Sequence, residues 1–331
     1  MESCQRIGPI AEVPQVLATF GDEPARVITS AGIDPSLLHD PENALSFPEL
    51  DRLFQACVAA TECEHFGLLL GQRSATTALG LVGRLMQTAP TLGDAILDLC
   101  ANHERYVRGA AVYLVVHDGM AFWGHAIHHP DMCTIEQFSD GALAQGFNIL
   151  RELVGASPED VRLRRQTPRD VIPYNRLFGT PLQFNAEQSA LVFPAKMLAR
   201  PVLSADSKLR STLQDSVSQY WAVRQPSFTD RLTRILSAQL TFGGGSLKDV
   251  ARYLSMHPRT LNRRLHAEGA SYRTLLSRAR SEAAQQLLTV TRMDVTTIAH
   301  SLGYADSSGF SHAFRRWSGK APIEWRAAGR N

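Results

Sequence analysis

Residues 295–317 read VTTIAHSLGYADSSGFSHAFRRW, and this stretch decides the fold of the C-terminal part of the chain. Apolar residues recur at the spacing i, i+3, i+4, i+7 over residues 295–302, which predicts a short helix with one buried face. Gly303 stands where a helix end favours a left-handed residue, and Asp306 is an N-cap residue type. The buried stripe of the next helix is expected to consist of Phe310, Phe314 and Trp317. Two short helices joined by a tight glycine turn form a helix-turn-helix pattern.

The same pattern occurs a second time, over residues 247–265. Its apolar residues repeat the spacing, residues 255–257 supply the turn, and Pro258 occupies the favoured first position of the second helix. Between the two units, residues 271–290 follow a helical pattern. At 1.5 Å per residue this connector is about 28 Å long, so it can hold two recognition helices about one DNA turn, or roughly 34 Å, apart.

This duplicated arrangement resembles the DNA-binding domain of the AraC/XylS family of bacterial transcription regulators. The resemblance covers residues 235–328 without a gap, and its most specific parts are the turn Gly319-Lys320-Ala321-Pro322 and the ending Glu324-Trp325-Arg326. It implies that the chain binds double-stranded promoter DNA, contacts RNA polymerase and acts as an activator. The alternative is a pair of amphipathic helical hairpins in an unrelated bundle.

The resemblance also implies which side chains face DNA. In the first recognition helix, the positions that match the base-reading residues of the family are Arg259, Asn262 and Arg263. Arginine can pair with guanine, and asparagine with adenine, through two hydrogen bonds each. The alternative role for these side chains is phosphate contact, which fixes register without reading sequence.

In the second recognition helix the matching positions are Ser307, Ser308, Ser311 and His312. Many relatives have arginine where His312 stands. Short hydroxyls and a histidine therefore predict weaker base reading in this half of the domain. The side chains expected to contact phosphates are Arg315, Arg316 and Lys320.

Charge is distributed unevenly along the chain. Residues 231–331 hold 16 Lys and Arg against 6 Asp and Glu, a net charge of +10. The first 230 residues hold 18 against 26, a net charge of −8. A basic C-terminal domain after an acidic N-terminal one is the charge pattern of phosphate binding confined to one end of a chain.

The first 200 residues predict a mixed domain, because the period of their hydrophobic residues changes along the chain. The clearest element is a hairpin of residues 111–117 and 120–128 around Asp118-Gly119, a typical two-residue turn. Helices are expected over residues 14–30, from Ser46 onward, from Thr91 to 106, and over 134–154 and 206–220. Strand pieces are expected at 161–164, Phe184 and 190–193, and residues 66–71 form a short apolar segment.

Several fragments of this part resemble the N-terminal effector and dimerisation domain of one AraC/XylS subgroup, the one with an arabinose-operon-regulator-type sensor domain. The matching fragments are residues 31–35, 66–68, 80–81, 89–95, 176–179 and 184–193. This resemblance implies a small-molecule effector and a homodimer, and it does not identify the effector or its contact residues.

The expected fold class is therefore mixed: an N-terminal α+β effector-binding domain followed by an all-α domain with two helix-turn-helix units joined by a linker helix. We expect the effector and dimerisation domain over residues 1–206, a linker helix and hinge over 207–230, and the DNA-binding domain over 231–331.

The chain is expected to be a cytoplasmic protein without a membrane partner. None of its apolar runs reaches the roughly 18 residues that a membrane helix needs, and the N-terminus lacks the basic start of a signal peptide. Its five cysteines are odd in number and have no C-x-x-C spacing, which argues against a disulfide framework and a zinc ribbon. Reduced thiols are expected, with a redox sensor as the alternative.

Common catalytic motifs are absent from the sequence, so we expect neither an enzyme nor a bound cofactor. One cluster of metal-ligand residue types follows the hairpin: His125, His128, His129, Asp131 and Cys133. We consider three roles for these residues: a metal site, an effector contact by one of them and an ordinary structural role, and we expect the last.

Tyr106 and Trp123 are likewise expected to be core residues rather than a ligand platform. The alternative function is a catalytic or metal-sensing N-terminal domain fused to a DNA-binding domain.

Overall fold

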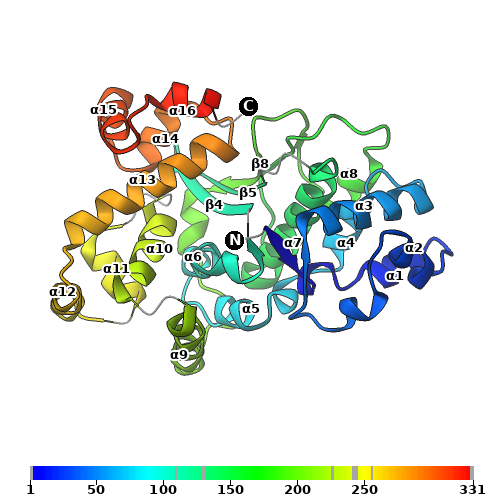
Figure 1. The fold of residues 1–331 in the computed structure, drawn as a ribbon, viewed down its shortest axis with the longest axis horizontal. Helices are drawn as coiled ribbons and strands as arrows, with labels where there is room; N and C mark the ends of the chain where they lie inside the picture. Colours follow the sequence, from blue (N-terminus) through cyan, green and yellow to red (C-terminus); the bar gives the residue numbers. More distant parts are fainter. Residues whose placement is uncertain are drawn as a thin grey trace.

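The computed structural model describes residues 3–108, 110–127, 132–224, 227–240, 245–254 and 256–328, which form a mixed N-terminal part and a helical C-terminal part (Figure 1). The N-terminal helices are α1 (Val13–Ala18), α2 (Pro24–Ser30), α3 (Phe47–Thr61), α4 (Phe66–Gln72), α5 (Gly80–Gln87), α6 (Leu92–Asn102), α7 (Ile135–Val154) and α8 (Ile172–Phe178). The strands are β1 (Cys4–Arg6), β2 (Ala44–Ser46), β3 (Val107–Arg108), β4 (Ala110–His117), β5 (Met120–Ile127), β6 (Asp160–Arg162), β7 (Leu182–Gln183) and β8 (Ser189–Pro194). Short 3-10 helices cover Gly8–Ile10, Pro35–His39, Thr76–Leu79, His103–Arg105 and Ala195–Ala199.

The C-terminal part follows the long helix α9 (Ser207–Arg224). Its helices are α10 (Phe228–Leu240), α11 (Leu247–Tyr253), α12 (Pro258–Ala267), α13 (Tyr272–Val290), α14 (Val295–Ser301), α15 (Ser307–Ser318) and α16 (Pro322–Ala328). The structure confirms the expected mixed fold class. Across the described ranges, no helix is long and apolar enough to cross a membrane.

Two sheets organise the N-terminal part. The larger has the strand order β4-β5-β8-β6-β7, with β6 and β7 parallel and the other pairs antiparallel, and the smaller has the order β2-β1-β3. The predicted hairpin is β4–β5, and both turn residues have positive φ, 49° at Asp118 and 74° at Gly119. The long helix α7 packs against β5 and β8, so the main core of the domain lies between this helix and the sheet.

Two predictions for the N-terminal part are wrong in detail. The helix expected over residues 14–30 is broken into α1 and α2, because Gly21 adopts a left-handed φ of 82° and Pro24 begins a new helix. The apolar segment 66–71, for which the sequence predicts no particular element, forms the helix α4. Phe184 lies in a turn just after β7 rather than in a strand.

Both helix-turn-helix units form as predicted. The first pairs α11 with α12, the second pairs α14 with α15, and the 19-residue helix α13 connects them. Side-chain caps set the helix starts: Ser246 and Asp249 form a capping box at α11, and Asp306 accepts from the amide of Gly309 at α15. Gly303 has a φ of 78°, as the turn between α14 and α15 requires.

The two parts of the chain share a hydrophobic core. Helix α10 packs on α6, and α14 packs on β4. Ala101, Tyr113 and Val115 of the N-terminal part are buried in the same core as the helices of the C-terminal part. At the edge of this contact, the buried carboxylate of Asp98 accepts two hydrogen bonds from Arg210 of α9, at 2.7 and 3.1 Å. The contacts place the sheet of one part directly against the helices of the other.

Candidate nucleic-acid interface and ligand cavity

The first recognition helix, α12, has one buried and one exposed face. Leu261 and Leu265 are fully buried and anchor the helix. Arg259 and Arg263 are exposed and Asn262 is half-buried, so the three side chains predicted to read bases lie away from these anchors. Two long guanidinium groups and an amide on one exposed helix face offer hydrogen-bond donors to base edges and phosphates.

The second recognition helix, α15, is anchored by Phe310 and Phe314, which are fully buried. Ser307 and Ser311 are half-buried, and the Ser311 hydroxyl donates to the backbone oxygen of Ser307 at 2.7 Å. The exposed residues predicted to face DNA are Ser308, His312, Arg315 and Arg316. Because the Ser311 hydroxyl is already used inside the helix, the positions of α15 predicted to read bases offer fewer free donors than those of α12.

The two recognition helices lie on either side of α13, along the edge of the molecule away from α1–α4 (Figure 1). Within the described ranges, α12 packs mainly on α10 and α11, whereas α15 packs on α13, α14 and α16. The N-terminal part packs on α10 and α14 instead, which leaves the outward faces of α12 and α15 uncovered.

A carboxylate at the end of α12 fixes the start of α10. The Glu268 side chain accepts hydrogen bonds from the backbone amides of Phe228 and Thr229, at 2.9 and 2.8 Å, and from the hydroxyl of Ser227 at 3.1 Å. These bonds, led by one from the Thr229 hydroxyl, lower the pKa of Glu268 to about 2. The cap ties the first recognition helix to the helix that packs on the N-terminal part.

A cavity of about 100 Å³ lies in the N-terminal part, between the β4–β5 strands and the helices α4 and α7. Helices α4 and α7 approach closely because glycines meet there: a Cβ on Gly71 would lie 2.1 Å from the backbone oxygen of Gly141. Most of the lining is apolar. The polar side chains that line it are Gln5, His103, Tyr106, His125 and Gln145. No Asp, Glu, Lys or Arg is found among the described residues that line the cavity.

His125 of β5 is the distinctive residue of this cavity. Its side chain is buried, with 8% exposed, and neither ring nitrogen has a hydrogen-bond partner among the residues that the structure describes. Its ring lies 4.9 Å from that of Phe138, centroid to centroid. Burial, and to a smaller extent the neighbouring His103, lowers the pKa of His125 to about 3. The imidazole is therefore neutral near pH 7.

Other polar groups of the lining already have partners. Tyr106 donates its hydroxyl hydrogen to the backbone oxygen of Leu79 and accepts from the amide of Val82 at 3.1 Å. His103 Nδ1 lies 2.8 Å from the backbone oxygen of Cys100. Among the described residues of the lining, His125 is the one whose two buried ring nitrogens both lack a hydrogen-bond partner.

The sequence singled out His125 without indicating the cavity. Of the cluster of metal-ligand residue types, for which an ordinary structural role is expected, His128, His129 and Asp131 lie outside the described residues, and Cys133 is exposed. Tyr106 and Trp123 are buried, as predicted, and both also line the cavity. The lining residues come from segments far apart in the chain, so no local pattern could have grouped them.

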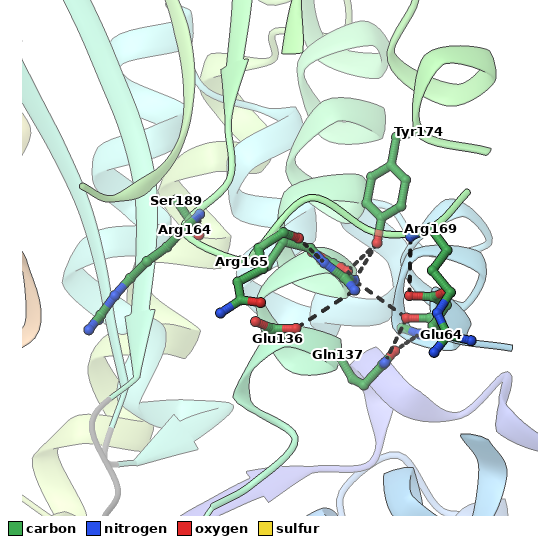
Figure 2. Close-up of polar contacts among 11 residues, drawn as sticks. Glu64, Glu136, Gln137, Arg164, Arg165, Arg169, Tyr174 and Ser189 are labelled. Carbon is green, nitrogen blue, oxygen red and sulfur yellow. Dashed lines mark hydrogen bonds and ion pairs between the residues drawn. The ribbon is translucent and has the colours of Figure 1, made fainter. Parts of the chain in front are cut away.

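A second set of polar side chains in the N-terminal part forms a hydrogen-bond network with a structural role (Figure 2). Arg165, with 7% exposed, forms hydrogen bonds with Asp140 and Tyr174, and the Tyr174 hydroxyl donates to Asp140 at 2.6 Å. Figure 2 shows the guanidinium of Arg165 directed at the Tyr174 hydroxyl, and Glu136 lies 3.7 Å from the same guanidinium. The network joins α7 and α8 with compensated charges, and none of these four residues lines the cavity.

The chain matches two family models, and together they cover both parts. Residues 21–202 match the arabinose-binding domain of AraC transcription regulator, N-terminal, and residues 250–328 match a helix-turn-helix domain. The first match alone spans more than half of the 331 residues.

Curated relatives are similar over nearly the full length. The chain is 29% identical over 318 residues to the ornithine utilization regulator of Pseudomonas aeruginosa, with 95% of this chain and 93% of the relative covered. It is 25% identical over 320 residues to the HTH-type transcriptional regulator VirS of Mycobacterium tuberculosis, with 95% and 94% covered. A solved structure of the transcriptional regulator CdpR from Pseudomonas aeruginosa is 22% identical, with a TM-score of 0.49 and coverage of 95% and 97%.

These relatives are named as transcription regulators rather than as enzymes. The matched models correspond to the two halves described above, a mixed N-terminal domain and a helical domain with two helix-turn-helix units. The chain therefore belongs to the AraC/XylS family of transcription regulators, in the subgroup whose N-terminal domain is of the arabinose-binding type.

Proposed function

We propose that this regulator binds an asymmetric promoter site by placing α12 and α15 in successive major grooves. The observation that carries the proposal is that two recognition helices with uncovered outward faces lie on either side of the helix α13 that connects the two units. A 19-residue helix is about 28 Å long, close to the roughly 34 Å between successive major grooves on one face of DNA. The net charge of +10 over residues 231–331 favours phosphate contact at this end of the molecule.

Within this interface, we assign base reading mainly to α12, through Arg259, Asn262 and Arg263. The exposure of both arginines supports the assignment. We assign a weaker share to α15, through Ser307, Ser308, Ser311 and His312. Phosphate contacts are assigned to Arg315, Arg316 and Lys320, which are all exposed.

The domain organisation and the partners of the protein complete the proposal. We propose an effector and dimerisation domain over residues 1–206, a linker over 207–230 and a DNA-binding domain over 231–331. The protein would act in the cytoplasm as a homodimer that activates transcription through RNA polymerase. An effector shifts DNA occupancy only if it binds two conformations of the N-terminal domain unequally.

A similar regulator is named for ornithine utilization, but this chain offers little support for the same ligand. Ornithine carries two ammonium groups and a carboxylate. The cavity has no charged side chain among its described lining residues to pair with them. Burial of unpaired charges is strongly unfavourable.

The proposal is tested by selecting bound fragments from a random-sequence DNA pool with the full chain. We expect one enriched site with two conserved blocks whose centres lie about 10 base pairs apart. The block contacted by α12 should be the more strongly conserved. A single block, or two blocks separated by half a helical turn, would contradict simultaneous binding by both helices.

A further inference from the structure

The cavity of the N-terminal part combines an apolar wall with one unsatisfied polar group. Its apolar lining includes Val112, Trp123, Phe138, Leu143 and Ile149. A wall of this kind favours an apolar ligand surface, because burial removes that surface from water. Few polar groups then decide which molecule is held, and in which orientation.

His125 supplies that polar group. A neutral imidazole has one nitrogen that donates and one that accepts. Both nitrogens of His125 lack partners among the described residues although the side chain is 8% exposed. Buried groups in native proteins almost always make their hydrogen bonds, so this pair of unmade bonds indicates a missing partner in the cavity.

The volume of the cavity and the absence of charge in its described lining limit which ligands it can bind. Cavities of about 150 Å³ lined by apolar side chains hold benzene, so a cavity of about 100 Å³ admits a single-ring molecule only after slight expansion. A charged ligand would lose its hydration without gaining an ion pair, because no charged side chain occurs in the described lining. An uncharged molecule avoids this loss.

We infer that the cavity binds a small, uncharged, mainly apolar molecule with one hydroxyl or amide group, and that His125 hydrogen-bonds that group. The inference rests on the proposed ligand-responsive function and names its ligand class. A hydroxyl or primary amide suits this site, since either can donate to one ring nitrogen or accept from the other.

Phenol is the probe for the test, measured with the purified full chain by calorimetry or by saturation-transfer NMR. Toluene has the same ring without the hydroxyl, and benzoate and ornithine are charged. We expect phenol to bind with a millimolar or lower Kd, toluene at least fivefold more weakly, and the charged probes not to bind. In His125→Leu, the preference for phenol over toluene should fall to about one.

Two further variants test whether the effect of His125→Leu is specific and whether the probes bind in the cavity. His39→Leu makes the same exchange at an exposed histidine outside the cavity and should leave the preference unchanged. Val112→Phe, on the strand beside His125, fills the cavity and should abolish binding of both phenol and toluene. Circular dichroism and binding to the selected DNA site establish that each variant is folded.

Several results would overturn the inference. These are no binding of either neutral probe, equal binding of phenol by the wild type and His125→Leu, or tight binding of ornithine or benzoate. If neither neutral probe binds, a single ordered water is the hydrogen-bond partner of His125. Failure of the inference is separable from failure of the proposed function, because DNA selection is run on the same protein. A chain that selects the two-block site but binds no probe refutes the ligand class alone.

Discussion

The ring of Tyr113 on β4 lies directly over Gly124, its partner on β5. A Cβ added at Gly124 would lie 2.2 Å from Cζ of the tyrosine. Tyr113 is buried in the core shared with the DNA-binding helices, whereas the next pair in the register, Val112 and His125, faces the cavity. Neighbouring residues on a strand point to opposite faces of the sheet. The β4–β5 hairpin is therefore one wall of the cavity and also a surface on which the DNA-binding part packs.

The close contact between Tyr113 and Gly124 predicts that a methyl group added at Gly124 destabilises the β4–β5 hairpin. Gly124→Ala should displace the Tyr113 ring and lower the free energy of unfolding by about 1–3 kcal/mol, as overpacking typically does. It should also change DNA affinity, although Gly124 lies far from the recognition helices in the sequence. Urea unfolding and DNA titration of the full chain measure the two effects.

Gly309→Ala is the matched exchange for the stability measurement. There the added Cβ would make an ordinary contact, 3.5 Å from the Asp306 carboxylate. It should leave stability unchanged or raise it by up to about 1 kcal/mol, because alanine restricts the unfolded chain more than glycine does. Equal stability of the two variants would argue against a tight Tyr113–Gly124 contact.

The neutral His125 predicts a pH dependence of stability. In the folded chain its pKa is lowered to about 3, whereas an unfolded chain protonates histidine near pH 6.5. Below pH 6.5 the unfolded state binds a proton that the folded state does not, so stability falls as pH falls towards 3. The loss between pH 6.5 and 4.5 should be about 2 kcal/mol.

Denaturant midpoints of the wild type and His125→Leu at pH 7.5 and 4.5 isolate this contribution, since the other groups titrate in both proteins. The wild type should lose more stability on acidification than the variant. The same loss in both would mean that His125 is protonated in the folded state or satisfied by a partner.

The Glu268 cap predicts a local loss of stability. Glu268→Gln weakens the four charge-assisted hydrogen bonds that Ser227, Phe228 and Thr229 donate to this side chain. Loss of a helix cap costs about 1 kcal/mol. Because the folded pKa is lowered to about 2, the cap contributes above about pH 4.5 and is lost as pH falls towards 2. Thermal unfolding at pH 7 and pH 3 measures both features, and Glu23→Gln is the control at an exposed carboxylate that makes no side-chain cap bond. A pH-independent difference would contradict the role of the charge.

Salt dependence tests the phosphate contacts. A domain with a net charge of +10 that contacts several phosphates should show a log–log slope of DNA affinity against salt of roughly −4 to −8. Arg315→Ala should weaken binding to all sequences alike and reduce the magnitude of the slope by about 1. A wild-type slope near −1 would contradict the phosphate contacts assigned to α15.

The sequence predicted those elements whose determinants are local. Both helix-turn-helix units follow from apolar spacing, caps and Gly303, and the hairpin follows from Asp118-Gly119, whose positive φ values need such residues. Elements that depend on distant partners were predicted less well. Helix α4 contains two glycines that weaken its helix propensity, and its packing against α7 compensates.

The cavity depends on still more distant contacts. Gln5, Tyr106 and His125 lie on different elements and meet only in the folded domain. A histidine with unused nitrogens has the same local sequence as one with partners, so only the structure distinguishes an effector contact from an ordinary core histidine.

The most direct measurement is DNA binding by Arg263→Ala and His312→Ala, each titrated against the selected site and against every single-base substitution within it. If Arg263 pairs with a guanine, its loss should cost about 1–3 kcal/mol on the selected site and relax the preference at one base pair, with a much smaller effect on non-specific binding. His312→Ala should cost less. If Arg263→Ala instead weakens all sequences equally, the arginine only holds the DNA backbone, and the assignment of base reading to α12 is wrong.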